Sequence, residues 1–192
     1  MIFNIDEIPS ISKAINLLIR GEIIIYPTDT LYGFGVDATN SIAINKLNLL
    51  KKRKQPYSIL VSDMQMIKKY SVFSKEIGFK LDNIFPGPYT AILEKSKNNG
   101  LSQSITLGLE TIGIRIPKNK FALNLVRELG KPIITTSVNR HGNAALNNID
   151  EIKKVFNNIA LFKDNSLNNN SLGSTIIDYT VKPEKILRYG DE

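Results

Sequence analysis

Five short polar stretches carry residue types that bind anions, and each follows or ends an apolar run. The first, "YPTDTLYGFG", presents Thr28, Asp29 and Thr30 directly after a strand-like run. The others hold Lys51 to Lys54 in "KKRKQP", Arg115 in "GIRIP", Ser137 and Asn139 in "TTSVNRHG", and Ser174 and Arg188 in "LGSTIIDYT" and "ILRYG". Guanidinium and ammonium groups bind phosphate and carboxylate oxygens strongly. These stretches therefore favour a site for an anionic ligand.

Each stretch also has a purely structural interpretation. Thr, Asp and Gly after a strand are typical turn residues. Lysines in the last turn of a helix stabilise the helix dipole. Arg115 could pair with a carboxylate of the protein, and Ser137 and Asn139 could cap a turn. No single stretch decides between structure and function.

Alternating helix and strand patterns position the polar stretches at strand ends, where sites on α/β scaffolds usually lie. Gly21 is expected to end the first helix in the left-handed conformation, and Gly130 to end the helix over residues 119–129. "FPGP" predicts a turn, and the Asn- and Ser-rich residues 165–174 predict a mobile loop. The periodicity predicts helices over residues 10–20, 41–51, 63–70, 74–83, 119–129 and 149–156, and strands over residues 22–26, 57–61, 89–94, 111–116, 132–138, 159–162, 174–179 and 185–189.

These elements predict one α/β domain over residues 1–192. Some of the strands are joined too closely to be parallel neighbours, so the sheet is expected to be mixed. No run approaches the roughly 18 apolar residues that cross a bilayer. The N-terminus also lacks the basic-then-apolar order of a secretory signal, so a soluble, cytoplasmic protein is expected.

Composition limits the chemistry further. The chain has no Cys, which excludes disulfides and Cys-ligated zinc, and its single His leaves no His-rich metal cluster. A metal would be a hard cation held by oxygens and substrate phosphates. The net charge of +7 fits a nucleotide or RNA partner, or Lys that serves solubility. Both interpretations stand, because no block of five like charges appears.

Seven motifs in a fixed order are much more specific than any one of them. The sequence resembles the threonylcarbamoyl-AMP synthase family with its YrdC-like domain, in the short, single-domain type. The resemblance covers nearly the whole chain. It rests on Pro27-Thr28-Asp29-Thr30-Leu31-Tyr32-Gly33-Phe34-Gly35, Lys51-Lys52-Arg53, Pro86-Gly87-Pro88, Arg115-Ile116-Pro117, Ser137-Val138-Asn139, Ser174-Thr175 and Leu187-Arg188.

The resemblance implies a fold and an activity. The fold is a twisted mixed β-sheet flanked by helices with a concave basic face, as in YrdC/RibB-like proteins. The activity is that of an L-threonylcarbamoyladenylate synthase, a nucleotidyltransferase that uses L-threonine, bicarbonate or CO2, and ATP, and releases pyrophosphate. Other proteins then transfer the threonylcarbamoyl group to tRNA, where it forms threonylcarbamoyladenosine (t6A).

The resemblance also implies roles for individual residues. Lys51 and Arg53 are expected to be catalytic and to bind the triphosphate, while Mg²⁺ is held mainly through the phosphates, with no metal ligand from the chain. Asp29 is expected to face away from the phosphates and hold the loop, and His141 to be a bystander. L-Threonine is assigned to Thr30, Arg115 and Ser174, and ATP to Lys51, Arg53, Tyr57, Ser58, Ser137, Asn139, Asn147 and Arg188.

The chain departs from the family pattern in places, and two other functions stay open. Residues 54–58 differ from many relatives, and Ser62 stands where several carry His. One alternative is an RNA-binding module that uses the basic face, including for tRNA, without synthesis; the chain has no cluster of RNA-stacking aromatics to favour it. The other is a carbamoyl-adenylate-handling relative, like the YrdC-like domain of hydrogenase maturation proteins. Those proteins add zinc-finger segments that a chain without Cys lacks.

Overall fold

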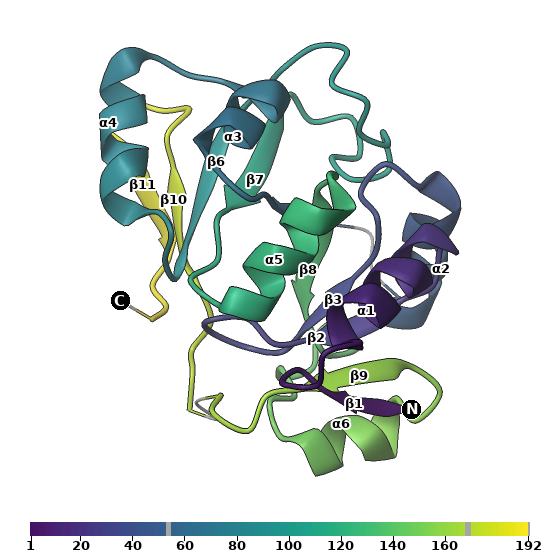
Figure 1. The fold of residues 1–192 in the computed structure, drawn as a ribbon. Coiled ribbons are helices and arrows are strands. Elements are labelled where there is room, and N and C mark those ends of the chain that lie inside the picture. The colour runs from purple at the N-terminus through teal and green to yellow at the C-terminus, as the bar shows by residue number, and fades with distance from the viewer. Residues whose placement is uncertain (53–54, 168–169, 192) are drawn as a thin grey trace.

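A mixed β-sheet runs through the middle of the molecule, and helices pack on it (Figure 1). The computed structural model describes residues 1–52, 55–167 and 170–191. The strand order is β1-β9-β2-β3-β8-β4-β7-β6-β10-β11, with β5 paired to β6, and both parallel and antiparallel neighbours occur. The predicted mixed sheet is therefore confirmed. The strands are β1 (Ile2–Asn4), β2 (Ile24–Tyr26), β3 (Gly33–Gly35), β4 (Ser58–Leu60), β5 (Ser71–Val72), β6 (Tyr89–Lys95), β7 (Thr111–Arg115), β8 (Ile133–Ser137), β9 (Ala160–Lys163), β10 (Thr175–Asp178) and β11 (Lys185–Arg188).

The six predicted helices all form, with bounds that differ by one residue at most. Asn side chains cap three of them: Asn40 accepts from the first backbone amides of α2, Asn119 from α5 and Asn148 from α6. Gly21 takes the left-handed conformation just after α1, as predicted, and Gly130, at the predicted end of α5, takes the same conformation there. The helices are α1 (Ser10–Ile19), α2 (Ser41–Lys51), α3 (Met64–Tyr70), α4 (Lys75–Ile84), α5 (Lys120–Leu129) and α6 (Ile149–Val155). Among the described residues, no helix is long and apolar enough to span a membrane.

The two faces of the sheet pack into two separate hydrophobic clusters. Successive side chains of a strand point to opposite faces, so Ile59 and Ile134 join the larger cluster, together with residues of α2 and α6. Leu60 and Ile133 point the other way, into a smaller cluster covered by α1 and α5. These two helices lie side by side in front of the sheet (Figure 1). The face that they cover also carries the candidate site.

Three short strands were not predicted. β1 and β5 have only three and two residues, too few for an alternating pattern to stand out. The third, β3, corrects the interpretation of the glycines after the strand as turn residues, because Gly33 and Gly35 belong to a strand that pairs antiparallel with both β2 and β8. A Cβ atom on Gly35 would lie 2.7 Å from Cε1 of Tyr26. Glycine at this position therefore lets a fully buried aromatic ring pack against the strand.

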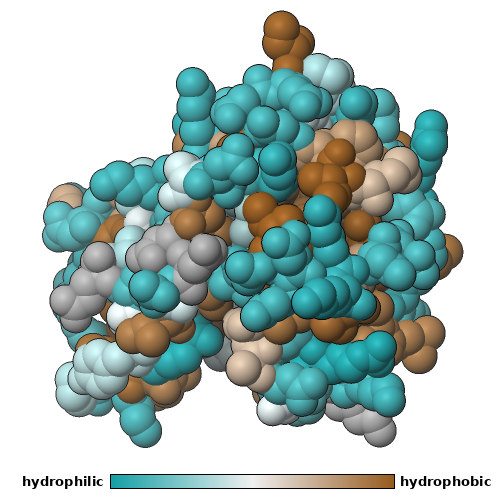
Figure 2. Space-filling model, turned by 90° about the horizontal axis from the view of Figure 1, so that it is seen from below, coloured by the Kyte–Doolittle hydropathy of each residue, from teal (hydrophilic) through white to brown (hydrophobic). Residues whose placement is uncertain are grey.

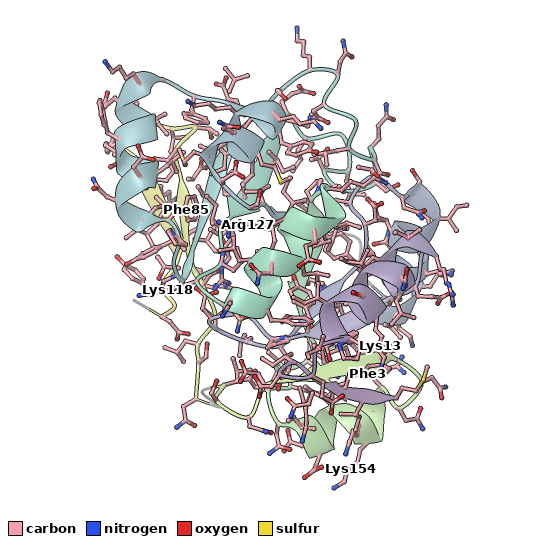
Figure 3. The ribbon with its side chains drawn as sticks, viewed as in Figure 1. Phe3, Lys13, Phe85, Lys118, Arg127 and Lys154 are labelled. Atoms are coloured by element: carbon pink, nitrogen blue, oxygen red, sulfur yellow. The ribbon has the colours of Figure 1, made fainter. Side chains whose placement is uncertain are left out.

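The surface offers little continuous apolar area in the view of Figure 2, where hydrophilic residues cover most of the face and hydrophobic ones form small patches. At the edge of the sheet, Lys13 Nζ lies 4.7 Å from the centre of the Phe3 ring, and both residues are labelled in Figure 3. The described parts of the predicted loop, residues 165–167 and 170–174, contain no helix or extended strand. Its mobility stays a prediction, since residues 168–169 lie outside the described residues.

Candidate active site

A cavity of about 160 Å³ opens on the face of the sheet that α1 and α5 cover in part. Ser58 is two residues before Leu60, and Thr135 is two residues after Ile133, so each hydroxyl side chain lies on the same face of the sheet as its apolar neighbour. The hydrophobic cluster under α1 and α5 ends at these two residues. The cavity wall combines hydroxyl groups with two guanidinium groups. It is formed by Thr28, Thr30, Leu31, Tyr32, Gly33, Ser58, Thr90, Arg115, Thr135, Thr136, Ser137, Gly173, Ser174, Ile176 and Arg188.

Strand register builds the floor of the cavity. Ser58 of β4 lies opposite Thr135 of β8 on one side and Gly113 of β7 on the other. A Cβ atom on Gly113 would collide with Ser58 Oγ, so the absence of a side chain leaves room for that hydroxyl. The floor is thus polar although it lies inside a sheet.

Arg115 brings a buried positive charge to this floor. Arg115 is 4% exposed. Its guanidinium donates from Nη2 to Asp29 Oδ1 at 2.6 Å and from Nη1 to Thr30 Oγ1 at 2.9 Å. Burial lowers the pKa of Arg115, and the negative charge of Asp29 acts in the opposite direction. Arg115 Nε is buried and has no hydrogen-bond partner among the described residues. Arg115 therefore pairs with a carboxylate of the protein, as the structural interpretation predicts, and it also lines the cavity, as a ligand-binding role would require.

The loop after β2 holds Thr30 in place through Thr28. Thr28 Oγ1 donates its proton to the carbonyl oxygen of Leu31 at 2.8 Å and accepts from the backbone amide of Thr30 at 3.1 Å. Asp29 lies outside the cavity wall and ties the loop to β7 through Arg115. This position agrees with the prediction that Asp29 holds the loop.

Ser174 and Arg188 form the opposite rim. The Arg188 guanidinium donates from Nε and Nη2 to the Ser174 carbonyl oxygen at 3.0 and 2.7 Å, and from Nη2 to Ser174 Oγ at 3.1 Å. Ser174 Oγ also lies 2.8 Å from Thr90 Oγ1. Burial, and then the nearby charge of Arg115, lower the pKa of Arg188. Within the described part of the chain Arg188 forms no ion pair.

Lys51 lies behind the cavity wall, at the end of α2. It is 1% exposed, and its Nζ donates to the carbonyl oxygens of Ser137 and Asn139 at 2.6 and 3.1 Å and to Asn139 Oδ1 at 2.6 Å. Ser137 Oγ, which does line the cavity, donates to the same Asn139 Oδ1 at 3.1 Å. Lys51 therefore fixes the end of β8 directly and the Ser137 hydroxyl through Asn139 Oδ1.

The remaining predicted residues that the structure describes do not line the cavity. Tyr57 is buried and lies outside the wall. Asn147 accepts from the backbone amide of Tyr32 at 2.9 Å and so supports the first loop. Ser62 is buried, donates to Asp63 Oδ2 at 2.7 Å and does not line the cavity. Arg53 lies outside the described residues, so the structure does not test its predicted role.

Sequence reasoning missed several wall residues, among them Thr90, Thr135 and Ile176. Two signals could have found them. Thr135 is two residues before Ser137 and shares its face, and Thr90 pairs with Ile176 across β6 and β10. The first signal can be read from the sequence by alternation, whereas the second requires knowledge of strand pairing.

The described residues contain no group of three or more His, Cys, Asp and Glu that could hold a metal ion. The cavity wall offers hydroxyl oxygens and guanidinium groups, and none of its described members is a carboxylate. This donor set does not build a protein cage for a divalent cation.

Comparison with known proteins gives a consistent family. The Sua5_yciO_yrdC family model, described as "Telomere recombination", matches residues 16–190. The threonylcarbamoyl-AMP synthase of Bacillus subtilis (strain 168) is 36% identical over 137 residues, which are 70% of this chain and 39% of that protein. The threonylcarbamoyl-AMP synthase of Pseudoalteromonas translucida (strain TAC 125) is 33% identical over 175 residues, 88% of this chain and 92% of that one.

A solved structure extends the likeness to the fold. The crystal structure of P. abyssi Sua5 complexed with L-threonine superposes with a TM-score of 0.91 at 26% identity, and covers 99% of this chain and 57% of that chain. This chain thus spans little more than half of the P. abyssi protein and, as given above, 39% of the B. subtilis relative.

Proposed function

Because the chain belongs to the Sua5/YciO/YrdC family, we propose that it is an L-threonylcarbamoyladenylate synthase. The substrates in this proposal are L-threonine, bicarbonate or CO2, and ATP, and the products are the adenylate and pyrophosphate. Several of the relatives carry the name threonylcarbamoyl-AMP synthase. The product would serve t6A formation on tRNA after transfer by other proteins.

The observation that carries the proposal is the composition of one cavity wall. Arg115 and Arg188 face the same small cavity, and the hydroxyl groups of Thr30, Ser58 and Ser174 lie beside them. Two guanidinium groups suit two anionic groups, a carboxylate and a phosphate. Joining an amino acid to a nucleotide needs such a pair of sites within reach of each other.

The proposed chemistry needs positioning more than a nucleophilic side chain. The neutral amine of threonine adds to CO2 and releases one proton to solvent, which gives a carbamate. A carbamate oxygen then forms a bond to the α-phosphorus of ATP while the bond from that phosphorus to pyrophosphate breaks. Arg115 would hold the threonine carboxylate, and Arg188 would neutralise charge on the phosphates. Electrostatic stabilisation by fixed donors then supplies much of the acceleration.

Lys51 enters the proposal as the residue that places Ser137 and Asn139 for the nucleotide, given its three hydrogen bonds to them. Arg53 is proposed to contact the triphosphate. Mg²⁺ is proposed to arrive with ATP and to neutralise charge on the departing pyrophosphate, in line with a wall of hydroxyl and guanidinium groups.

The test is an incubation with ATP, Mg²⁺, bicarbonate and L-threonine in which pyrophosphate and the adenylate are both measured. Pyrophosphate release should depend on threonine and on bicarbonate, and the adenylate should appear in equal amount. Pyrophosphate release that is the same with and without threonine would contradict the proposal. Salt-sensitive tRNA binding without pyrophosphate release would instead favour the RNA-binding alternative.

A further inference from the structure

The two guanidinium groups of the cavity are compensated in different ways. Arg115 is paired with the carboxylate of Asp29 at 2.6 Å, and the side chains of this pair are 5% and 13% exposed. Arg188 donates instead to the neutral oxygens of Ser174 and forms no ion pair with any described residue. The Arg115 end of the cavity is therefore close to electrically neutral, whereas Arg188 has no described carboxylate within ion-pair distance and is compensated only by the more distant charge of Asp191.

The Asp29–Arg115 pair keeps some capacity to bind a ligand. Arg115 Nε and Asp29 Oδ2 are both buried, and neither has a hydrogen-bond partner among the described residues. Arg115 lines the cavity and Asp29 does not. A ligand can thus accept a hydrogen bond from Arg115 while the charge of Asp29 remains close to it.

We propose that Asp29 is a specificity-determining residue, which makes the Arg115 end of the cavity a subsite for a zwitterionic amino acid and disfavours a phosphate dianion there. An amino acid carries its own ammonium group beside its carboxylate, so it meets a neutral ion pair without net repulsion. A phosphate dianion meets the attraction of Arg115 and the repulsion of Asp29 together. In a partly buried site such charges interact strongly at a few ångströms.

The consequence is a sorting of two anionic substrates between two arginines. Without Asp29, both guanidinium groups would attract phosphates, and free phosphate or ATP would compete with the amino acid at Arg115. With Asp29, phosphate is directed to Arg188. The identity of the amino acid as threonine rests on the proposed function, whereas the sorting of charge rests on the contacts of Asp29, Arg115 and Arg188.

The first test uses inorganic phosphate alone, at constant ionic strength, and measures its affinity by calorimetry and by the shift of the unfolding midpoint. Asp29→Asn keeps the size of the side chain and an acceptor for Arg115 Nη2 but removes the charge. We expect it to bind phosphate at least about tenfold more tightly than the wild type. Asp29→Glu, which keeps the charge, should stay within about twofold of the wild type.

A double variant tests whether the extra phosphate affinity of Asp29→Asn arises at Arg115. In Asp29→Asn/Arg115→Gln both members of the pair are neutral, so the buried pair is replaced without leaving a single charge. The extra phosphate affinity should disappear in this variant. Equal phosphate affinity in the wild type and Asp29→Asn, or a gain that survives the double substitution, would overturn the inference.

A second variant keeps the inference testable if Asp29→Asn does not fold. Arg188→Gln changes a side chain of an exposed edge strand, and it should weaken phosphate binding by about tenfold or more because Arg188 carries the net charge. Unchanged phosphate affinity in Arg188→Gln would place phosphate at Arg115 in the wild type and contradict the inference.

Addition of L-threonine separates this inference from the proposed function. Phosphate should compete with threonine in Asp29→Asn and not in the wild type. A wild type that binds no threonine, together with the phosphate gain in Asp29→Asn, would refute the proposed function and leave the sorting of charge intact. Threonine-dependent synthesis by the wild type, with no gain in phosphate affinity in Asp29→Asn, would refute the sorting of charge and leave the proposed function intact.

Discussion

The candidate site divides into two proposed halves, which differ in how many of their residues line the cavity. The half proposed to bind the amino acid consists of Thr30, Arg115 and Ser174, and all three line the cavity. In the nucleotide half, Ser58, Ser137 and Arg188 line it, whereas Lys51 and other predicted residues lie behind the wall. The nucleotide half comprises, within the described residues, Lys51, Tyr57, Ser58, Ser137, Asn139, Asn147 and Arg188.

The residues of the site therefore fall into two groups: those that can contact a ligand directly, and those that hold the contacting residues in place. A residue in the wall can act on a ligand through its own atoms. A residue behind the wall acts through what it holds, as Lys51 holds Ser137 and Asn139 and as Asn147 holds the amide of Tyr32. Substitutions in the two groups should therefore divide between ligand affinity and the stability of the fold.

The largest effect is expected for Arg115→Gln. It removes one partner of a buried ion pair and leaves Asp29 without its counter-charge, which should lower the free energy of unfolding by about 3 kcal/mol. Loss of a charge-assisted bond to the threonine carboxylate should raise KM for threonine by at least about tenfold. KM for ATP should change little. Urea unfolding and steady-state pyrophosphate release measure the two effects.

The matched control for Arg115→Gln is Asp29→Asn/Arg115→Gln, which should regain most of the lost stability and keep the raised KM for threonine. A raised KM for ATP with an unchanged KM for threonine would move Arg115 to the nucleotide half. The proposed division of the two substrates between the halves would then fail at Arg115, the residue for which the largest effect is expected.

The second largest effect is expected for Lys51→Met. Met fills a similar volume but removes the Lys51 donor from the carbonyl oxygens of Ser137 and Asn139, while Asn139 Oδ1 still accepts from Ser137 Oγ, so the free energy of unfolding should fall by about 2 kcal/mol. KM for ATP should rise because the end of β8 is no longer fixed, while the affinity for threonine measured by calorimetry should stay close to that of the wild type. Equal losses for both substrates would show that the two halves are not separable at this position.

The sequence predicts the helices and most strands because their patterns are local. The heptad-like apolar spacing of residues 10–20 and the glycine after them define α1 without reference to the rest of the chain. β1 and β3 could not be found in the same way. β1 is short and pairs with a strand far away in the sequence, with Ile2 opposite Leu161. β3 pairs with the nearby β2 as well as the distant β8, but its three residues, Gly-Phe-Gly, show no strand-like pattern.

The candidate site was predicted in its residue types better than in its geometry. The ordered motifs point to Arg115 and to Ser174, which lie in the wall. They cannot show that Lys51 is turned toward the end of β8, or that Asp29 takes one hydrogen bond of Arg115, because both contacts join segments more than eighty residues apart. Spacing along the chain carries no information about such pairs.

A smaller effect is expected for Thr30→Val in the amino-acid half. The substitution keeps the branched shape and removes the hydroxyl that accepts from Arg115 Nη1 at 2.9 Å. KM for threonine should rise about fivefold, the equivalent of about 1 kcal/mol for one hydrogen bond. Thr30→Ser keeps the hydroxyl and should remain near the wild type. If Thr30→Ser is as impaired as Thr30→Val, the methyl group rather than the hydroxyl is responsible.

The smallest effect is expected for Ser137→Ala in the nucleotide half. Ser137 Oγ lines the cavity and donates to Asn139 Oδ1 at 3.1 Å, but Lys51 Nζ also donates to that oxygen, so its loss leaves no acceptor unsatisfied. The free energy of unfolding should therefore change by less than about 0.5 kcal/mol. KM for ATP should rise by about threefold, which corresponds to less than the ~1 kcal/mol typical of one neutral hydrogen bond. KM for threonine should not change. This pattern, a change in affinity without a change in stability, is the reverse of that expected for Lys51→Met. A loss of stability as large as that of Lys51→Met would mean that Ser137 supports the wall and does not contact the nucleotide.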